Sequence, residues 1–279
     1  MGEKSATAMR VGIVGGGTIA RLFLEHIQRG ELGDAAVVAI AGRSERSRGK
    51  ALAAEFGVAF ATGLEGLLAE CPDVVVEAAS HEAVHQYAEM LLARGIATIV
   101  LSGGALADDA LRVRLERAAE TSGAMLYVPS GGIGGLDALK AACVAGVEEV
   151  TIAVTKPPAA WKGIPYVDRL GIDLSALKEP RVLFEGTARE GVPLFPANVN
   201  IAAVLSLAGI GFDRTRLKVV ADPALVYNTH YIDIRGRTGN IAIKLENVPA
   251  PENPKTAWLA CYSALAALKV ARSPVRYGT

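Results

Sequence analysis

Two short segments contain residue types that could do chemistry. The segment Ser80-His-Glu-Ala-Val-His85 includes HEAVH, which fits the zinc-protease pattern H-E-x-x-H. On a helix, two histidines at this spacing share a face and bind zinc, while the glutamate between them acts as a base. Earlier in the chain, Gly15-Gly-Gly-Thr-Ile-Ala20 is a G-x-G-x-x-A loop, a type that binds the pyrophosphate of a dinucleotide. The elements around the two motifs decide which chemistry to expect.

The elements of the first half are short apolar runs that alternate with amphipathic segments. Continuous apolar runs of this kind are typical of strands buried on both faces of a parallel sheet. The expected strands span residues 10–14, 36–41, 58–60, 73–79 and 97–102, and a further helix over 108–123 leads to another expected strand over 124–129. The alternation predicts an α/β fold that begins with a Rossmann domain, a doubly wound parallel sheet over residues 1–124.

The residue pattern changes after Gly135, where longer expected strands have alternating polar and apolar residues. The expected strands span 149–155, 181–188, 216–222, 230–236 and 240–247, and helices are expected over 136–146 and 198–209. We expect a second α+β domain over 125–250, built on a mostly antiparallel sheet. The segment 251–279 is expected to contain a helix that starts at Pro254 and packs back on the first domain.

The glycine loop lies between the first expected strand and the first helix, where dinucleotide-binding proteins place it. Gly15 permits the tight turn and Gly17 lets the pyrophosphate approach the backbone. Thr18 and Ile19 open the helix, whose N-terminal N–H groups would face the phosphates. The context favours a dinucleotide site over a merely tight turn.

The end of the second expected strand bears on which cofactor is used. NAD enzymes usually carry an acidic residue there for the ribose 2′-hydroxyl, whereas this chain has Arg43 and Ser44. Arginine pairs with a 2′-phosphate. NADP, or use of both NAD and NADP, is therefore favoured over strict NAD. The alternative is a solvated loop with ordinary surface arginines.

The HEAVH segment follows the expected strand 73–79, so His81 and Glu82 should occupy the first turn of the next helix. In a doubly wound fold this end of the sheet faces the cofactor, and Ala79 and Ser80 are candidate cofactor contacts. The chain has four histidines and no evident third zinc ligand. We therefore expect neither a metal site nor a protease.

Charge and cysteine content limit the possible partners. Lys+Arg and Asp+Glu both number 29, so the net charge is zero and neither nucleic acid nor a membrane surface is indicated as a partner. The three cysteines are widely spaced and form no metal-binding or disulfide pattern. A cytoplasmic location is the simplest expectation.

Several motifs of the chain, taken together, resemble those of the L-aspartate dehydrogenases. The matching segments, beyond the glycine loop, are LSGGALAD (101–108), SGGIGGLDALKAA (130–142), TKPP (155–158), FPANVNIAA (195–203), NTHYIDIRG (228–236) and NPKTAWLACYSALAAL (253–268). This resemblance covers nearly the whole chain. It implies a Rossmann domain followed by an α/β domain, a homodimer, and NAD(P)-dependent oxidation of L-aspartate to iminoaspartate, which yields oxaloacetate and ammonia or feeds NAD biosynthesis.

The resemblance also implies roles for particular residues. His230 would be the catalytic residue, and Gly132 and Asn198 would contact the nicotinamide end of the cofactor. The family often has alanine where this chain has Gly132. Candidate partners for the substrate carboxylates are Lys156, Arg235, Lys244 and the N–H groups of the SGGIGG loop.

Three alternatives stay open at this point. The chain could be a related oxidoreductase, similar to homoserine dehydrogenase or dihydrodipicolinate reductase. It could be a sensor that binds NADP(H) without catalysis, or a zinc hydrolase. Each shares either the nucleotide loop or the HEAVH segment with the favoured interpretation.

Overall fold

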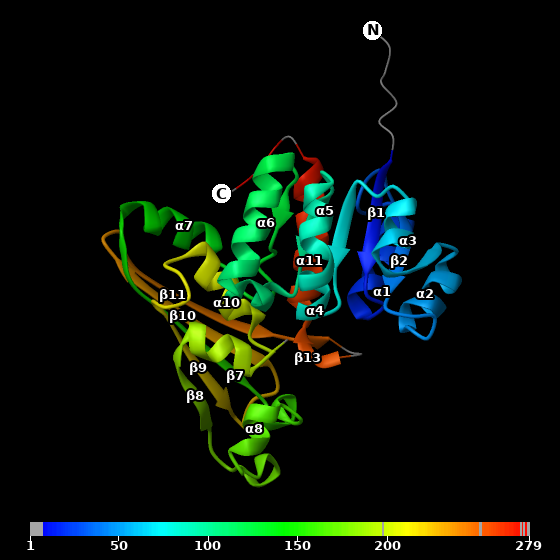
Figure 1. Cartoon of the computed structure of the whole chain (residues 1–279). Helices are drawn as coiled ribbons and strands as arrows, with labels where there is room; N and C mark the ends of the chain where they lie inside the picture. The colour runs from blue at the N-terminus through cyan, green and yellow to red at the C-terminus, as the bar shows by residue number, and fades with distance from the viewer. Residues whose placement is uncertain (1–7, 197, 251–252, 274, 276, 278–279) are drawn as a thin grey trace. The chain divides into compact units, whose positions relative to one another are not determined.

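The computed structural model describes residues 8–196, 198–250 and 253–273, together with 275 and 277. The chain forms two compact units, whose helices and strands are drawn in Figure 1. Unit 1 contains the described residues up to Pro129 and those from Ala264 to Ser273, and unit 2 contains those from Ser130 to Ser263, with 275 and 277. No helix in the described part of the chain has the length and apolar character that a membrane span requires.

Unit 1 is built on a six-stranded sheet with the order β3-β2-β1-β4-β5-β6. Every neighbouring pair is parallel, as the sequence predicts. The strands are β1 (Met9–Val14), β2 (Ala35–Gly42), β3 (Ala59–Thr62), β4 (Val74–Glu77), β5 (Ala97–Val100) and β6 (Leu126–Tyr127). The carboxyl ends of β1, β2 and β4 are therefore neighbours, which is where a doubly wound sheet binds its ligand.

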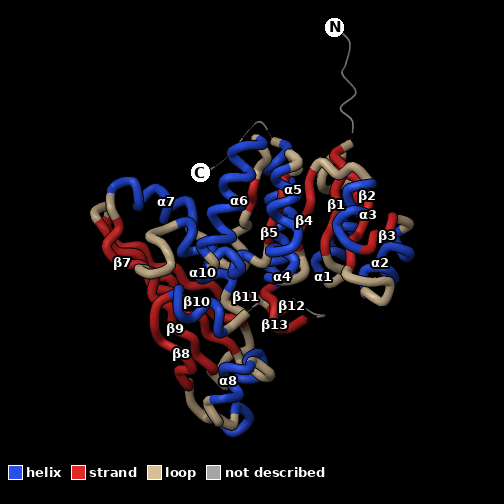
Figure 2. The backbone as a smooth tube through the Cα atoms, in the orientation of Figure 1, coloured by secondary structure: helices blue, strands red, loops and turns tan. Residues whose placement is uncertain are grey.

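The helices of unit 1 connect these strands, as the tube in Figure 2 shows. They are α1 (Thr18–Gln28), α2 (Arg48–Phe56), α3 (Gly63–Ala69), α4 (His81–Ala83), the π-helical turn η1 (Val84–Ala88), α5 (Glu89–Ala93), the 3-10 turn η2 (Gly103–Ala107) and α6 (Asp109–Ser122). The HEAVH segment thus begins α4 and runs into η1.

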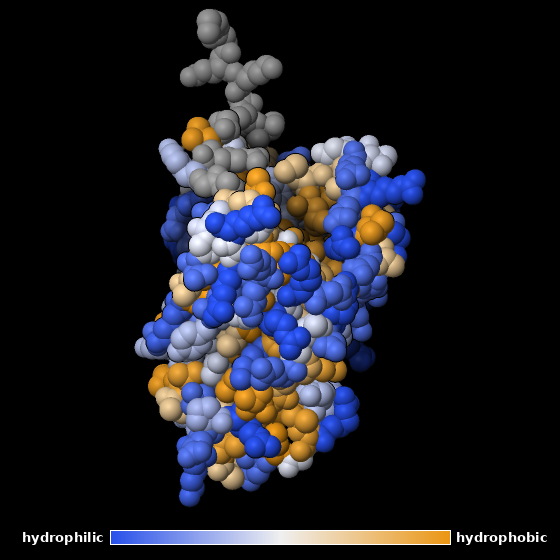
Figure 3. Space-filling view, turned by 90° about the vertical axis from the view of Figure 1, so that its left-hand side faces the viewer, coloured by the Kyte–Doolittle hydropathy of each residue, from blue (hydrophilic) through white to orange (hydrophobic). Residues whose placement is uncertain are grey.

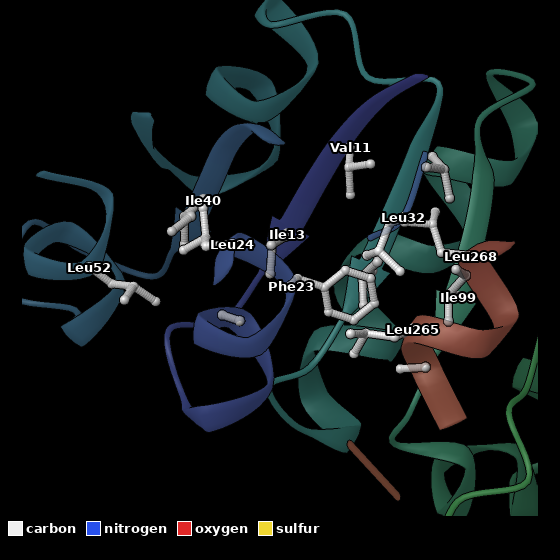
Figure 4. Packing of buried hydrophobic residues seen from close by; sticks show 14 of the residues in the cluster. Val11, Ile13, Phe23, Leu24, Leu32, Ile40, Leu52, Ile99, Leu265 and Leu268 are labelled. Atoms are coloured by element: carbon white, nitrogen blue, oxygen red, sulfur yellow. The ribbon is translucent and has the colours of Figure 1, made fainter. Parts of the chain in front are cut away.

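Two apolar cores cover the two faces of this sheet, because successive residues of a strand point to opposite sides. Val74 and Val76 of β4 belong to one core, and Val75 to the other. The first core also contains Phe23 of α1 and Leu265 of the last helix, α11 (Trp258–Arg272), both shown in Figure 4. The last helix therefore contributes its C-terminal part to the core of unit 1.

Unit 2 contains a five-stranded sheet with the order β11-β10-β7-β9-β8. Its strands are β7 (Val147–Lys156), β8 (Arg181–Thr187), β9 (Thr215–Ala221), β10 (Asn228–Gly236) and β11 (Gly239–Asn247). The β7–β9 pair is parallel and the other three pairs are antiparallel. The predicted mostly antiparallel sheet is confirmed, with one parallel pair that the sequence pattern does not distinguish.

The other elements of unit 2 are helices, short turns and a small two-stranded sheet. They are α7 (Leu136–Ala145), η3 (Pro158–Trp161), α8 (Pro165–Arg169), η4 (Leu174–Ala176), α9 (Ala188–Gly191), η5 (Val192–Leu194), α10 (Asn200–Ala208), β12 (Pro249–Ala250) and β13 (Asn253–Ala257). The prediction that the last helix starts at Pro254 is wrong. Pro254 lies in β13, which pairs with β12, and the helix begins at Trp258.

The two faces of the unit 2 sheet differ in polarity. Ile232 and Ile234 of β10 are buried, whereas Tyr231, Asp233 and Arg235 between them are exposed. On β10 the exposed face therefore carries one aromatic and two charged side chains, and the homodimer stays a prediction from the family resemblance. On the side drawn in Figure 3, hydrophilic residues cover much of the surface, and groups of hydrophobic residues lie between them, most visibly in the lower half of the view.

Candidate active site

The glycine loop of unit 1 follows β1 and has the geometry that a dinucleotide requires. Gly15 has a φ of 111°, and a Cβ there would lie 2.6 Å from the carbonyl oxygen of Ala78. Gly17 is the N-cap residue of α1, and a Cβ built on it meets nothing within 4 Å. Thr18 and Ile19 begin the helix, and no side chain caps it. These features fit a pyrophosphate, which needs a close approach to backbone N–H groups.

Gly16, to which the sequence analysis gave no role, is the most tightly constrained residue of the loop. A Cβ at Gly16 would lie 2.2 Å from the backbone nitrogen of Gly49 in α2. A side chain at Gly16 would push the loop away from α2, and a Cβ at Gly49 would lie 2.9 Å from the side chain of Ile40. The sequence gives no indication of this contact, because it joins two glycines in different strand–helix units.

Arg43 and Ser44 follow β2, as predicted, and both are exposed. A guanidinium nitrogen of Arg43 lies 3.9 Å from a carboxylate oxygen of Glu82 in α4. The side chains are 85% and 77% exposed, so this ion pair is weak and easily exchanged. The glutamate of the HEAVH segment is therefore the ion-pair partner of Arg43, the residue for which the sequence predicts a contact with a 2′-phosphate.

Ala79 and Ser80, the candidate contacts after β4, are held by Glu77 at the end of that strand. One carboxylate oxygen of Glu77 accepts hydrogen bonds from the backbone N–H groups of Ala79 (2.8 Å) and Ser80 (2.9 Å). Both Glu77 oxygens also bond to Ser102, which donates through its backbone N–H and its hydroxyl. Burial raises the pKa of the Glu77 carboxyl, and the hydrogen bonds oppose that rise.

The HEAVH segment does not form the surroundings of a zinc site. His81 and Glu82 begin α4 behind the N-cap residue Ser80, at the position predicted, and His85 is exposed within η1. No group of three or more His, Cys, Asp or Glu residues is placed to hold a metal ion in the described part of the chain.

His230, the expected catalytic residue, lies in β10 of unit 2 and is 2% exposed. Its Nδ1 atom is buried without a hydrogen-bond partner. Desolvation and the nearby charge of Lys156 lower the pKa of His230 to about 3, although a hydrogen bond with the Thr229 backbone acts in the opposite direction. The imidazole is therefore neutral near neutral pH, which is the form that accepts a proton.

Lys156 lies at the end of β7 and is 4% exposed, although lysine is rarely so buried. Its ammonium group donates to the backbone carbonyl of Asn198 at 3.1 Å and lies 5.3 Å from the centre of the Trp161 ring. The side-chain oxygen of Asn198 is itself buried without a partner. Of the three cations considered for the substrate carboxylates, Lys156 is the one beside His230.

The other two cations lie on the opposite face of the sheet. His230 pairs with Leu245, so its face of β11 carries Leu245 and the opposite face carries Lys244. Lys244 forms an ion pair with Glu246 at 3.1 Å, and Arg235 lies 3.7 Å from Glu149. Arg235 and Lys244 therefore lie on the wrong face of the sheet to contact a substrate at His230.

The SGGIGG loop packs on the His230 face of β11, and its glycines make this possible. Gly135 has a φ of 77°, and a Cβ there would lie 2.2 Å from the side chain of Ile243. The carbonyl of Gly132 accepts a hydrogen bond from Asn247 at 2.8 Å. The loop was expected to offer N–H donors to carboxylates, but at Gly132 the observed bond uses the carbonyl as an acceptor.

Two family models match the chain. Residues 137–271 match the model described as "Aspartate dehydrogenase, C-terminal", and residues 15–129 match "Homoserine dehydrogenase, NAD binding domain". An L-aspartate dehydrogenase of Methanosarcina mazei is 43% identical over 279 residues, covering 97% of this chain and 100% of that protein. The chain belongs to the aspartate dehydrogenase family. L-aspartate dehydrogenase 2 of Bordetella pertussis is 45% identical over 263 residues, covering 93% of this chain and 96% of that protein.

A solved structure of the aspartate dehydrogenase family has the same fold. The aspartate dehydrogenase of Thermotoga maritima is 32% identical and superposes with a TM-score of 0.72, covering 97% of this chain and 99% of that chain. The match over both units confirms the predicted Rossmann and α+β architecture. The alternative related to homoserine dehydrogenase accounts only for unit 1, since the second half matches the aspartate dehydrogenase model.

Proposed function

We propose that this protein catalyses the NAD(P)-dependent oxidative deamination of L-aspartate. The product would be iminoaspartate, which water converts to oxaloacetate and ammonia, and the reaction would be reversible. The observation that carries the proposal is the buried imidazole of His230 beside the ammonium of Lys156, in a chain of this family. The geometry supplies a neutral base and a cation within one small region of unit 2.

Cofactor binding would rest on the glycine loop and the neighbouring strand ends of unit 1. Gly15, Gly17, Thr18 and Ile19 would hold the pyrophosphate, because the loop is open at Gly17 and the helix start is not capped by a side chain. A bound nicotinamide cofactor accepts the hydride that leaves Cα of the substrate. Ala79 and Ser80 would contact the cofactor through the turn that Glu77 holds.

The family resemblance assigns two residues of unit 2, Asn198 and Gly132, to the nicotinamide end of the cofactor. Asn198 offers a buried side-chain oxygen without a partner, which suits the N–H groups of a carboxamide. Gly132 would contact the cofactor through its backbone.

His230 would remove a proton from the substrate ammonium. Only the neutral amine has the electron pair that forms the imine as the Cα–H bond breaks, so this proton must leave first. A base with a pKa of about 3 is weak, but a substrate with two carboxylates brings negative charge next to the imidazole. That charge raises the pKa of His230 toward the working range when substrate binds. The same imidazole would then activate the water that attacks the imine.

The direct test is the absorbance of reduced nicotinamide, measured with purified protein, L-aspartate, and NAD or NADP in turn. D-aspartate, L-glutamate and L-homoserine serve as control substrates. We expect the cofactor to be reduced with L-aspartate and with none of the three control substrates. No turnover with L-aspartate, and none in reverse with oxaloacetate and ammonia, would refute the proposed reaction and favour the NADP(H) sensor.

The His230→Asn variant tests the role of the imidazole. Turnover should fall by about 10²–10⁴-fold, because general acid–base catalysis contributes on that scale. The dissociation constant of the cofactor should stay within about twofold of the wild-type value, since His230 is not proposed to hold the cofactor. Unchanged turnover would show that His230 is not the base that takes the proton of the substrate ammonium.

The choice between NAD and NADP follows from Arg43. We propose that Arg43 and Ser44 accommodate a 2′-phosphate, so that NADP is used at least as well as NAD. The exposed guanidinium and its weak pairing with Glu82 support this proposal, because a phosphate can displace the carboxylate.

A further inference from the structure

Asn228 is the most unusual polar residue of unit 2 that the proposed function does not yet use. It is 1% exposed, and neither the nitrogen nor the oxygen of its side-chain amide has a hydrogen-bond partner. Buried polar groups are nearly always paired, because an unpaired donor or acceptor loses its bonds to water without replacement. An amide with both atoms unpaired indicates a ligand that supplies an acceptor and a donor.

The position of Asn228 places it among the residues of the proposed site. Asn228 and His230 are two residues apart on β10, so their side chains point to the same face. Asn228 pairs with Asn247 on β11. On the other side, Thr229 pairs with Thr155 of β7, which makes Lys156 the neighbour of Asn228. A polar row of Lys156, Asn228 and Asn247 therefore crosses three strands next to His230.

Lys156 and Asn247, on either side of Asn228, are each hydrogen-bonded to the backbone of a loop, whereas Asn228 is not. The Asn247 amide donates to Gly132, and the Lys156 ammonium donates to the backbone of Asn198. These bonds fix the sides of the row. The amide in the middle keeps both its donor and its acceptor available.

We propose that Asn228 binds the α-amino-acid group of the substrate. Its Nδ2 donates to a carboxylate that Lys156 also attracts, and its Oδ1 accepts an N–H from the amine whose proton His230 removes. An α-amino acid carries a carboxylate and an amine on one carbon, which matches the two ends of one planar amide. This assignment rests on the proposed function and extends it, because it names the residue that selects an amino acid over a simple dicarboxylate.

The test uses Asn228→Leu, which keeps the approximate shape of the side chain and removes both polar atoms. The KM for L-aspartate should rise about 10- to 100-fold, as for a site that loses hydrogen bonds to a charged group. The unfolding midpoint of the ligand-free variant should rise by about 2–4 °C, because an unpaired buried amide has been removed. Asn240→Leu, at an exposed asparagine of β11, is the matched control and should leave the KM unchanged.

Binding is measured separately from turnover. With reduced cofactor present, L-aspartate should raise the unfolding midpoint of the wild type more than succinate does, since succinate lacks the amine. Asn228→Leu should abolish this difference. Wild-type KM and a lower midpoint in the variant would overturn the assignment and show a structural amide, while the aspartate reaction would stand.

The two hypotheses fail in different ways. If the wild type shows no turnover but has an L-aspartate shift that Asn228→Leu removes, the binding assignment stands and the proposed reaction fails. If the wild type shows neither turnover nor a shift with any amino acid, both are overturned.

Discussion

Glu77 holds the turn after β4, and its replacement should weaken cofactor binding and unit 1 together. The carboxylate is 2% exposed and accepts four hydrogen bonds, three of them from backbone N–H groups. In Glu77→Gln, the amide oxygen can replace the acceptor of Ala79 and Ser80. The amide nitrogen then faces the N–H of Ser102, so two donors meet in a buried position.

The expected size follows from those bonds. One buried N–H without an acceptor costs about 1–3 kcal/mol, and removal of a buried charge offsets part of that loss. We expect Glu77→Gln to destabilise the protein by about 1–2 kcal/mol and Glu77→Ala by about 2–4 kcal/mol, since alanine leaves all three N–H groups without the carboxylate. In Glu77→Ala, cofactor affinity should also fall about 3- to 10-fold, because Ala79 and Ser80 lose their common acceptor.

The assay combines urea unfolding with titration of NAD or NADP into the ligand-free protein, followed by fluorescence. Ser102→Ala is the matched control, because it removes only the hydroxyl donor and should cost about 1 kcal/mol. If Glu77→Ala keeps both the unfolding midpoint and the cofactor affinity of the wild type, the network does not support the turn.

The same carboxyl gives a pH dependence with a defined sign. Its folded pKa is raised above the usual 4.5, so in the pH interval just above 4.5 the folded protein binds a proton that the unfolded chain has released. The free energy of unfolding contributed by Glu77 therefore decreases as the pH rises through this interval. Glu77→Gln should lack that contribution, which unfolding curves at several pH values would show.

Two further predictions concern Arg43 and His230. Arg43→Ala should lower the NADP/NAD ratio of kcat/KM about 10-fold or more in steady-state kinetics. Glu82→Gln should raise this ratio only about 2- to 3-fold, because an exposed ion pair contributes little. An unchanged ratio in Arg43→Ala would show that Arg43 does not bind the 2′-phosphate. The pKa of His230 falls from 6.5 to about 3 on folding, so between these values the unfolded chain binds a proton that the folded protein does not. The free energy of unfolding therefore falls as the pH drops from 6.5 toward 3, by up to about 1.4 kcal/mol per pH unit. Urea unfolding of the wild type and His230→Asn across this range should show a steeper acid dependence for the wild type, and parallel curves would contradict the burial of a neutral imidazole.

The sequence by itself determined the parallel sheet of unit 1 and the position of its glycine loop. Both are local properties, since apolar runs and glycine spacing are set by residues close together in the chain. The five strands of unit 2 were predictable for the same reason. The helix start at Pro254 was not, because β13 exists through its pairing with β12, and proline at a first turn is only a local preference.

Only the tertiary structure decided which polar residues share the site. Lys156, Arg235 and Lys244 were equivalent in sequence, and strand register placed Lys156 beside His230 and the other two on the opposite face. Asn228 gained significance only when burial left its amide unpaired. Asn247 and Gly132 are 115 residues apart and are joined by one hydrogen bond. Such contacts depend on pairing between distant strands and on the packing of loops over them, which no local pattern of residues encodes.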